Sequence, residues 1–313
     1  MHFENQEKKY HTYSDYLKRT FGKKVFKVAL NGYFTCPNKD GLKGTGGCIY
    51  CSPSGSGDFA GNAQDDLKTQ FQLVKTRMHE KWPDAYYIAY FQANTNTYKD
   101  VESLKTMFEY SLTLDEHIVG LSIATRPDAL DLEKIDMLAA LGKKTVLQVE
   151  LGLQSIHEET AIWMNRGHDL ACFDQAVRWL REKNIDVVVH IINGFPNENK
   201  AMMLKTVEHL NTLDIQGIKI HMLHVMEQTA LGVLYKKSPF PLLTLEAYVD
   251  IVVNQIELLN PNIIVHRVTG DSPKDSLIAP LWTLKKFVVM NEIDKLMRER
   301  HTYQGKNYKK NRH

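Results

Sequence analysis

Short apolar runs alternate along the chain with longer segments in which apolar residues recur every three or four positions. Runs of β-branched and aromatic residues predict strands, whereas the wider spacing predicts amphipathic helices. Six predicted strands cover residues 25–34, 86–91, 118–123, 145–149, 186–192 and 217–223. Predicted helices between them cover residues 65–79, 101–112, 132–141, 170–183 and 201–213, with Asp131 and Asp169 as N-terminal caps. Strands and helices that alternate about every 30 residues predict parallel βαβ units.

The pattern changes after the sixth strand and becomes mostly helical. One helix is predicted over residues 244–259 and another over residues 280–300, with a loop around residues 270–273 between them. The fold class is therefore α/β: a partial (β/α)6 barrel, similar to a TIM barrel, with a C-terminal helical extension. Missed strands near residues 263–268 would extend the barrel toward eight units.

We divide the chain into three predicted parts. They are a basic N-terminal extension (1–24), the partial barrel (25–240) and a C-terminal helical cap with a basic tail (241–313). The composition agrees with one folded barrel, because 43% of the 313 residues are hydrophobic and 24% are charged. The first nine residues are polar, and no run of 18 apolar residues occurs. We therefore expect a cytoplasmic protein that does not enter a membrane.

The charge is unevenly distributed along the chain. Residues 1–30 carry seven Lys and Arg against three Asp and Glu, and residues 294–313 carry seven against two. Because the whole chain is only +2, the middle is acidic. Basic ends favour a polyanion such as RNA as a partner, and solvated tails are the other interpretation. Five tyrosines near the ends either stack on unpaired bases or pack the terminal helices: Tyr10, Tyr13, Tyr16, Tyr303 and Tyr308.

Polar side chains follow each of the six predicted strands. The carboxyl ends of parallel strands meet at one edge of a barrel, and that edge carries the catalytic groups. We therefore expect these side chains to line one site. In strand order they are Cys36, Cys48 and Cys51; Gln92, Asn94 and Asn96; Thr125 and Arg126; Glu150 and Gln154; His190 and Asn193; and Lys219, His221 and His224.

Three of the four cysteines lie within sixteen positions, as Cys36-x11-Cys48-x2-Cys51, in a loop that contains four glycines. Three thiolates predict a four-iron cluster with one open iron, which can bind S-adenosylmethionine (SAM) and cleave it reductively to a 5′-deoxyadenosyl radical. The alternative is a zinc site that adds a histidine such as His79. Cys172 lies in a predicted helix and is expected to be a buried core residue.

Several short motifs resemble those of one enzyme superfamily. The cysteine motif is accompanied by Ala124–Asp128 (ATRPD), Glu150–Ser155 (ELGLQS), Asn165–His168 (NRGH) and Asn193–Pro196 (NGFP). Together they resemble the Elongator-type branch of the radical SAM superfamily, in particular its YtqA/YhcC-like group, over almost the whole chain. The resemblance implies a [4Fe-4S] cluster on Cys36, Cys48 and Cys51, with SAM as the second cofactor.

Roles for the other polar residues follow from the expected chemistry. Arg126 suits the SAM carboxylate, because arginine binds carboxylates through two hydrogen bonds. Glu150 and Gln154 are expected to bind the ribose or the amino group of SAM, and Glu150 is also a candidate catalytic residue. His190 and His221 are candidate proton carriers. The remaining predicted SAM contacts are Asn94, Arg166 and Asn193. Asn94 lies in the stretch where many relatives carry a Gly-Gly-Glu segment.

The resemblance also implies a substrate. Members similar to YtqA are implicated in an MnmL-type reaction that converts wobble 5-carboxymethylaminomethyl(-2-thio)uridine of tRNA to 5-aminomethyl(-2-thio)uridine. The expected partners are then a tRNA anticodon loop and an electron donor such as flavodoxin or ferredoxin. Carboxymethylation of the Elongator kind is disfavoured, because the residues after 270 are too few to build an acetyltransferase domain. Two alternatives remain. The protein is either a radical SAM enzyme that acts on a small molecule or a non-catalytic RNA-binding protein stabilised by a metal.

Overall fold

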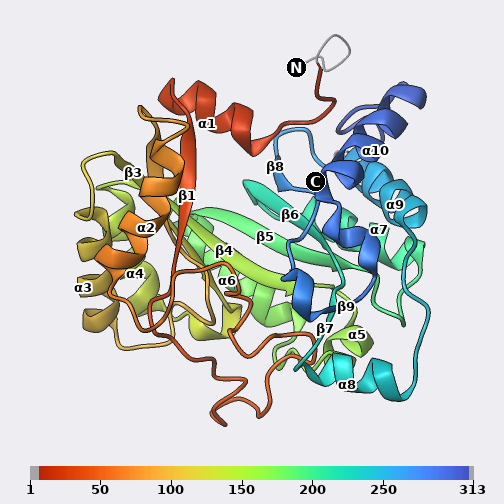
Figure 1. The fold of residues 1–313 in the computed structure, drawn as a ribbon, viewed down its shortest axis with the longest axis horizontal. Helices are drawn as coiled ribbons and strands as arrows, with labels where there is room; N and C mark the ends of the chain where they lie inside the picture. The colour runs from red at the N-terminus through yellow and green to blue at the C-terminus, as the bar shows by residue number, and fades with distance from the viewer. Residues whose placement is uncertain (1–6, 310–313) are drawn as a thin grey trace.

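The computed structural model describes residues 7–309 as one curled parallel sheet with helices on its outer face (Figure 1). Seven strands follow one another in the order β1-β2-β3-β4-β5-β6-β8, and each pairs with its neighbours in parallel. The predicted α/β partial barrel is confirmed. Its strands are β1 Val25–Leu30, β2 Tyr86–Phe91, β3 Ile118–Thr125, β4 Val146–Gln154, β5 Asp186–Asn193, β6 Gly217–Met222 and β8 Ile264–Arg267.

The predicted crossover helices are present, although their ends shift by a few residues. They are α2 Leu67–His79, α3 Val101–Leu112, α4 Leu132–Gly142, α6 Leu170–Glu182 and α7 Lys200–Leu210, followed by α9 Leu245–Leu258 and α10 Lys286–Glu299. Asp131 and Asp169 cap α4 and α6 as predicted, since each side chain accepts a backbone N–H of the first turn. Elements that the periodicity did not reveal are α1 Tyr13–Phe21, α5 Glu158–Trp163, α8 Ala230–Lys237 and the two-stranded ribbon of β7 Val225–Met226 with β9 Leu277–Ala279.

The predicted number of six parallel strands is one too low, because β8 extends the sheet beyond β6. This strand has only four residues, and two of them, His266 and Arg267, are polar, so only the short apolar run Ile263–Val265 marks it. Tertiary contacts form it instead: Thr12 pairs with Val265 from the other side, and the Val265 backbone N–H donates to the His11 carbonyl (2.8 Å).

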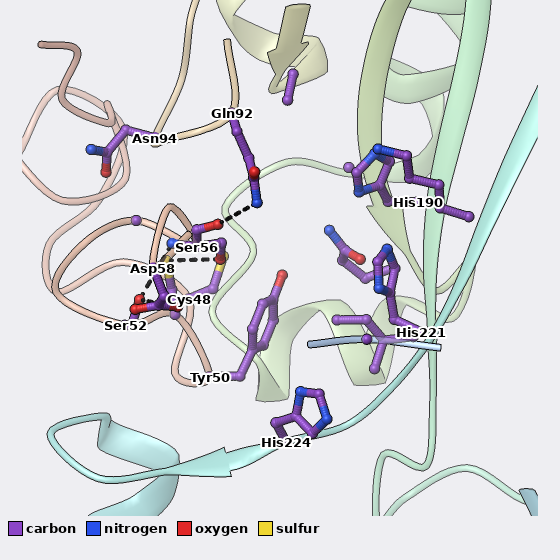
Figure 2. Close-up of a pocket in the computed structure, with 18 of the residues that line it drawn as sticks. Cys48, Tyr50, Ser52, Ser56, Asp58, Gln92, Asn94, His190, His221 and His224 are labelled. Atoms are coloured by element: carbon purple, nitrogen blue, oxygen red, sulfur yellow. Dashed lines mark hydrogen bonds between the residues drawn. The ribbon is translucent and has the colours of Figure 1, made fainter. Parts of the chain in front are cut away.

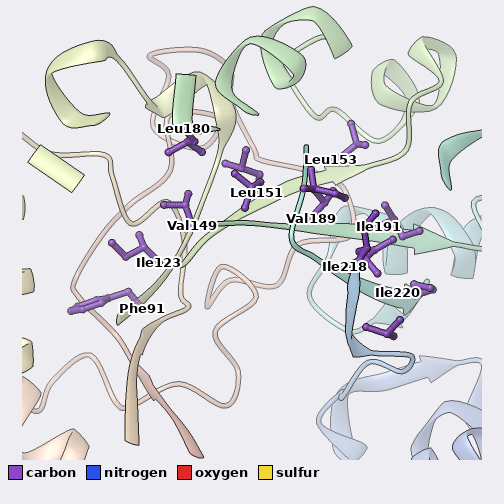
Figure 3. Packing of buried hydrophobic residues seen from close by; sticks show 14 of the residues in the cluster. Phe91, Ile123, Val149, Leu151, Leu153, Leu180, Val189, Ile191, Ile218 and Ile220 are labelled. Carbon is purple, nitrogen blue, oxygen red and sulfur yellow. The ribbon is translucent and has the colours of Figure 1, made fainter. Parts of the chain in front are cut away.

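Alternating residues of each strand divide the sheet into an apolar outer face and a polar inner face. Outward residues such as Val149, Leu151 and Leu153 of β4 pack with Val189 of β5 and Ile218 of β6 in one buried cluster (Figure 3). Inward residues include the polar side chains of Lys27, Glu150, His190 and Lys219, and the largest hydrophobic cluster lies between the sheet and its helices. The inner face therefore carries side chains that can line a functional site.

The described parts of both chain ends pack against the barrel. Tyr10 is 5% exposed, and the Tyr13 ring stacks on His266 at 3.8 Å between ring centroids. Neither ring is free to stack on a base, so for these two tyrosines the packing interpretation is correct. Gln304 is also buried and donates to the carbonyls of Asn260 and Ile263. Lys310 and Arg312 of the predicted basic tail lie outside the described residues.

None of the helices within residues 7–309 combines the length and the apolar character needed to span a bilayer.

Candidate functional site

A cavity of about 320 Å³ opens at the carboxyl ends of the strands. Cys36, Cys48 and Cys51 line it from the loop that follows β1, and His190 and His221 line it from β5 and β6. Figure 2 shows Cys48 on one side of the cavity and the two histidines on the other. Every predicted site residue except Asn96 and Asn193 lines this cavity, as expected for groups at one edge of a parallel barrel.

The cysteine loop is held by backbone hydrogen bonds. Within it, the Lys39 N–H donates to the Cys36 carbonyl (2.8 Å) and the Cys51 N–H to the Cys48 carbonyl (2.9 Å). The loop is also fastened to the segment after α5, because the Ile49 N–H donates to the Met164 carbonyl (3.0 Å). These bonds bring three cysteines that are separated in sequence to the wall of one cavity.

Asn94 packs directly on this loop. Its backbone N–H donates to the Gly55 carbonyl (2.9 Å), and a Cβ atom on Gly55 would come within 1.9 Å of the Asn94 Oδ1. Gly55 also has φ +67°, a conformation that favours glycine. Only glycine at position 55 allows Asn94 to lie at the cavity wall beside the cysteines.

The three thiols suit an iron–sulfur cluster by their chemistry. All four cysteines are free, and Cys172, half-buried on α6, does not line the cavity. Burial raises the pKa of Cys48 to about 11 and raises that of Cys51, so these thiols need a cation to become thiolates at neutral pH. Within residues 7–309, no three His, Cys, Asp or Glu side chains converge as one zinc ion requires. A cluster instead binds each thiolate through a different iron, so its ligands need not meet at one point.

Glu150 lies in the middle of β4, since the strand continues to Gln154 rather than ending at residue 149. Its carboxylate accepts bonds from side chains on five other strands. Oε1 accepts from Lys27 (2.5 Å) and Ser122 (2.9 Å), and Oε2 accepts from Tyr90 (2.8 Å), Lys219 (2.5 Å) and His190 (2.7 Å). Each of β1 to β6 thus contributes one side chain, and we call these six residues the Glu150 layer: Lys27, Tyr90, Ser122, Glu150, His190 and Lys219.

Burial and charge shift the titrations in this layer strongly. Burial acts to raise the pKa of Glu150, but Lys219 and Lys27 outweigh it and hold the pKa well below 4.5. Burial lowers the pKa of Lys219 from 10.5 to about 7, although Glu150 opposes the shift. Burial and Lys219 together lower the pKa of His190 to about 4. At neutral pH His190 is therefore uncharged, and Glu150 is a carboxylate.

Two predicted SAM contacts already have protein partners. The Arg126 guanidinium forms two bonds with the Asp128 carboxylate (2.9 and 2.8 Å) and donates to the Arg166 carbonyl (2.8 Å). Arg166 is 1% exposed and donates to the carbonyls of Leu153, Ser155 and His168. Both arginines therefore fasten loops at the cavity wall.

Asn193 faces away from the cavity. Its side-chain amide exchanges two hydrogen bonds with Gln255 of α9 (2.8 and 2.9 Å). Because this buried pair satisfies both amides, the structure does not bring Asn193 to a cofactor. The NGFP motif instead joins β5 to the C-terminal helices.

The sequence interpretation missed Lys27, Tyr90 and Ser122 of the Glu150 layer, and Arg267 at the cavity wall. Lys27 and Tyr90 lie inside predicted strands rather than after them, and Arg267 lies in the strand that was not recognised. A charged residue inside an otherwise apolar strand, such as Lys27 within VFKVAL, was the available signal, because such a charge needs a buried partner.

Comparisons with known proteins agree with this architecture. Residues 41–210 match the radical SAM superfamily and residues 215–299 match the radical SAM C-terminal domain. Protein YtqA of Bacillus subtilis is 51% identical over 304 residues, covering 97% of this chain and 94% of that protein. Protein YhcC of Escherichia coli K12 is 33% identical over 296 residues, covering 92% of each.

More distant similarity extends to enzymes named for tRNA. The tRNA uridine(34) acetyltransferase of Methanocaldococcus jannaschii is 25% identical over 182 residues, which cover 57% of this chain and 33% of that protein. The structure of the Methanocaldococcus infernus Elp3 superimposes with a TM-score of 0.66 at 20% identity, covering 90% of this chain and 64% of that one. The superfamily implies a [4Fe-4S] cluster and SAM as cofactors. This protein therefore belongs to the radical SAM superfamily of enzymes and, within it, to the YtqA/YhcC-like family related to the Elp3 branch.

Proposed function

We propose that this enzyme modifies the wobble uridine of tRNA and converts 5-carboxymethylaminomethyl(-2-thio)uridine to 5-aminomethyl(-2-thio)uridine. Loss of a hydrogen atom, an electron and a proton from the glycyl CH2–NH unit gives an imine, which water hydrolyses to the 5-aminomethyl product and glyoxylate, with SAM as the oxidant overall. One observation carries the proposal: the three cysteines and four residues of the Glu150 layer (Tyr90, Glu150, His190 and Lys219) line the same cavity, where a small substituent can reach both groups. Similarity to a tRNA uridine(34) acetyltransferase supports tRNA as the substrate class. The proposed partners are the anticodon loop and an electron donor such as flavodoxin or ferredoxin.

Cys36, Cys48 and Cys51 are the proposed cluster ligands, because they are the cysteines at the cavity wall. When bound, the cluster and SAM supply the radical that removes a hydrogen atom from the substrate. Asn94 and Gln154 line the same cavity without the extensive pairing seen for Arg126, so we propose them as SAM contacts. Arg126 retains one N–H on each terminal nitrogen, and we assign it first to positioning the loop that carries Arg166.

His190 is proposed to face the amine of the substrate. Its Nε2 donates to Glu150 when the ring is neutral, which leaves Nδ1 as an acceptor at the cavity. Nδ1 can then accept a proton from the substituent, and Glu150 stabilises the imidazolium that results. His221 lies next to it, with 5.3 Å between ring centroids, and is the second proposed proton carrier.

Nucleoside mass spectrometry of tRNA from a deletion strain tests this function. The strain should accumulate the 5-carboxymethylaminomethyl nucleosides and lose the 5-aminomethyl products. A plasmid copy with Cys48→Ala should fail to restore the products, whereas Cys172→Ala, the matched control outside the cavity, should restore them. An unchanged nucleoside profile would contradict the proposal and favour a small-molecule substrate.

A further inference from the structure

Lysine and arginine side chains outnumber carboxylates on the wall of the cavity, with Lys39, Arg126, Arg166, Lys219 and Arg267 against Asp58, Glu150 and Asp271. Glu150 is shared by two ammonium groups, Lys27 and Lys219. Asp271 is likewise shared by two cations, Arg267 and Lys286. Both carboxylates therefore carry more cationic partners than their charge can balance. The cavity attracts a further negative charge.

Two histidines at the cavity wall have ring nitrogens without a hydrogen-bond partner. Nε2 of His221 and Nε2 of His224 are buried and have no hydrogen-bond partner within the protein. Both residues line the cavity, and Figure 2 shows them on the same side of it. A buried polar atom without a partner costs about 1–3 kcal/mol, so a ligand that supplies a partner is favoured here.

We propose that Lys219, His221 and Arg267 form a subsite for a carboxylate of the substrate. All three line the cavity, and they come from the neighbouring strands β6 and β8. Lys219 is only 7% exposed, which admits a slender charged substituent more readily than a phosphate of a polynucleotide backbone. The inference rests on the proposed function, and it assigns the glycyl carboxylate of the wobble substituent to this subsite.

The subsite should depend on pH through Lys219. Because its pKa is lowered to about 7, Lys219 is only partly charged at neutral pH, and a bound carboxylate raises its pKa. Affinity for the carboxylate should then fall above pH 7, by up to about tenfold per pH unit. The titratable or charged groups that face Lys219 from the surrounding strands are Glu150, Tyr90, Lys27, His190, His221, His266 and Arg267.

Binding of N-methylglycine to the cluster-loaded protein, measured by ligand-observed NMR without reductant, tests the subsite. N-methylglycinamide is the matched probe, because it lacks only the negative charge. The acid should bind the wild type at least about tenfold more tightly than the amide. Lys219→Met should abolish the preference and Lys219→Arg should retain it. Lys144→Met, which removes an exposed lysine paired with Glu109, should change nothing.

Saturating SAM distinguishes the two possible sources of the carboxylate. If the subsite belongs to the substrate, excess SAM leaves N-methylglycine bound, whereas displacement would assign the subsite to the methionine carboxylate and overturn the proposal. Equal binding of acid and amide by the wild type would also overturn it. If Lys219→Met does not fold, Arg267→Gln replaces it and should weaken the preference. Acid binding together with an unchanged tRNA nucleoside profile would retain the subsite and refute only the tRNA substrate.

Discussion

Replacing Glu150 by glutamine removes the only carboxylate of the Glu150 layer. The variant leaves Lys27 and Lys219 facing an amide, although each ammonium nitrogen lies 2.5 Å from the carboxylate in the wild type. Loss of one partner from a buried ion pair costs about 3–5 kcal/mol. Because Lys219 already has a pKa of about 7, it can release its proton and limit the loss. We expect the free energy of unfolding to fall by about 3–4 kcal/mol.

Lys219→Met is the matched variant, because Glu150 keeps Lys27 as its counter-ion. The change also removes an ammonium whose burial is costly, so we expect a loss below about 2 kcal/mol. Urea unfolding of cluster-free protein under reducing conditions, followed by circular dichroism, measures both variants. A Glu150→Gln loss no larger than the Lys219→Met loss would refute the view that Glu150 balances two buried cations.

The pH dependence of unfolding provides a second measurement on the same layer. Lys219 has a lower pKa in the folded protein than its ordinary 10.5, so between about pH 7 and 10.5 the unfolded chain binds more protons. Its contribution to stability therefore rises with pH, by at most about 1.4 kcal/mol per unit. Between pH 7.5 and 9.5, Lys219→Met should remove this rise relative to the wild type. A difference that stays constant across that range would contradict the lowered pKa.

Three further predictions concern the ends and the cysteines. Cys48→Ala should abolish the iron and acid-labile sulfide of reconstituted protein, whereas Cys172→Ala should retain both; full iron in Cys48→Ala would exclude it as a ligand. Gln304→Ala should lower the free energy of unfolding by about 1–3 kcal/mol, because the carbonyls of Asn260 and Ile263 lose their hydrogen-bond donor. Lys306→Ala, at an exposed position, should change the free energy of unfolding by less than about 0.5 kcal/mol. Deleting residues 306–313 should weaken tRNA binding and reduce the magnitude of its log–log salt slope by roughly 0.7 per lost phosphate contact; an unchanged slope would make this segment a solvated end.

The strand ends were predictable because strand–helix alternation fixes which loops share one edge of a barrel. That rule placed the three cysteines, Asn94 and His190 correctly at one cavity from spacing alone. The same rule does not report which partner each polar side chain will bind. Arg126 follows β3 as expected, yet it pairs with Asp128 only two residues later, a local partner that was visible in the sequence.

Asn193 shows where sequence reasoning fails for a physical reason. Its partner, Gln255, is 62 residues away on α9, and no periodicity reports which helix will cover the end of β5. β8 is a similar case, since four residues become a strand only because β6 and the segment at Thr12 supply hydrogen bonds on both sides. Contacts between distant segments, rather than local propensity, decide both features.

The Glu150 layer has a cost that apolar packing would avoid. Burying two ammonium groups and one carboxylate sacrifices solvation, and well-packed apolar side chains of similar volume are often as stable or more stable. Here six successive strands each direct one polar side chain inward, whereas the outer face of the same strands is apolar. Stability alone does not account for a polar layer beside the cavity. Its two lysines share one carboxylate, and Lys219, which also lines the cavity, is the member of the layer that the proposed subsite uses to bind a substrate carboxylate.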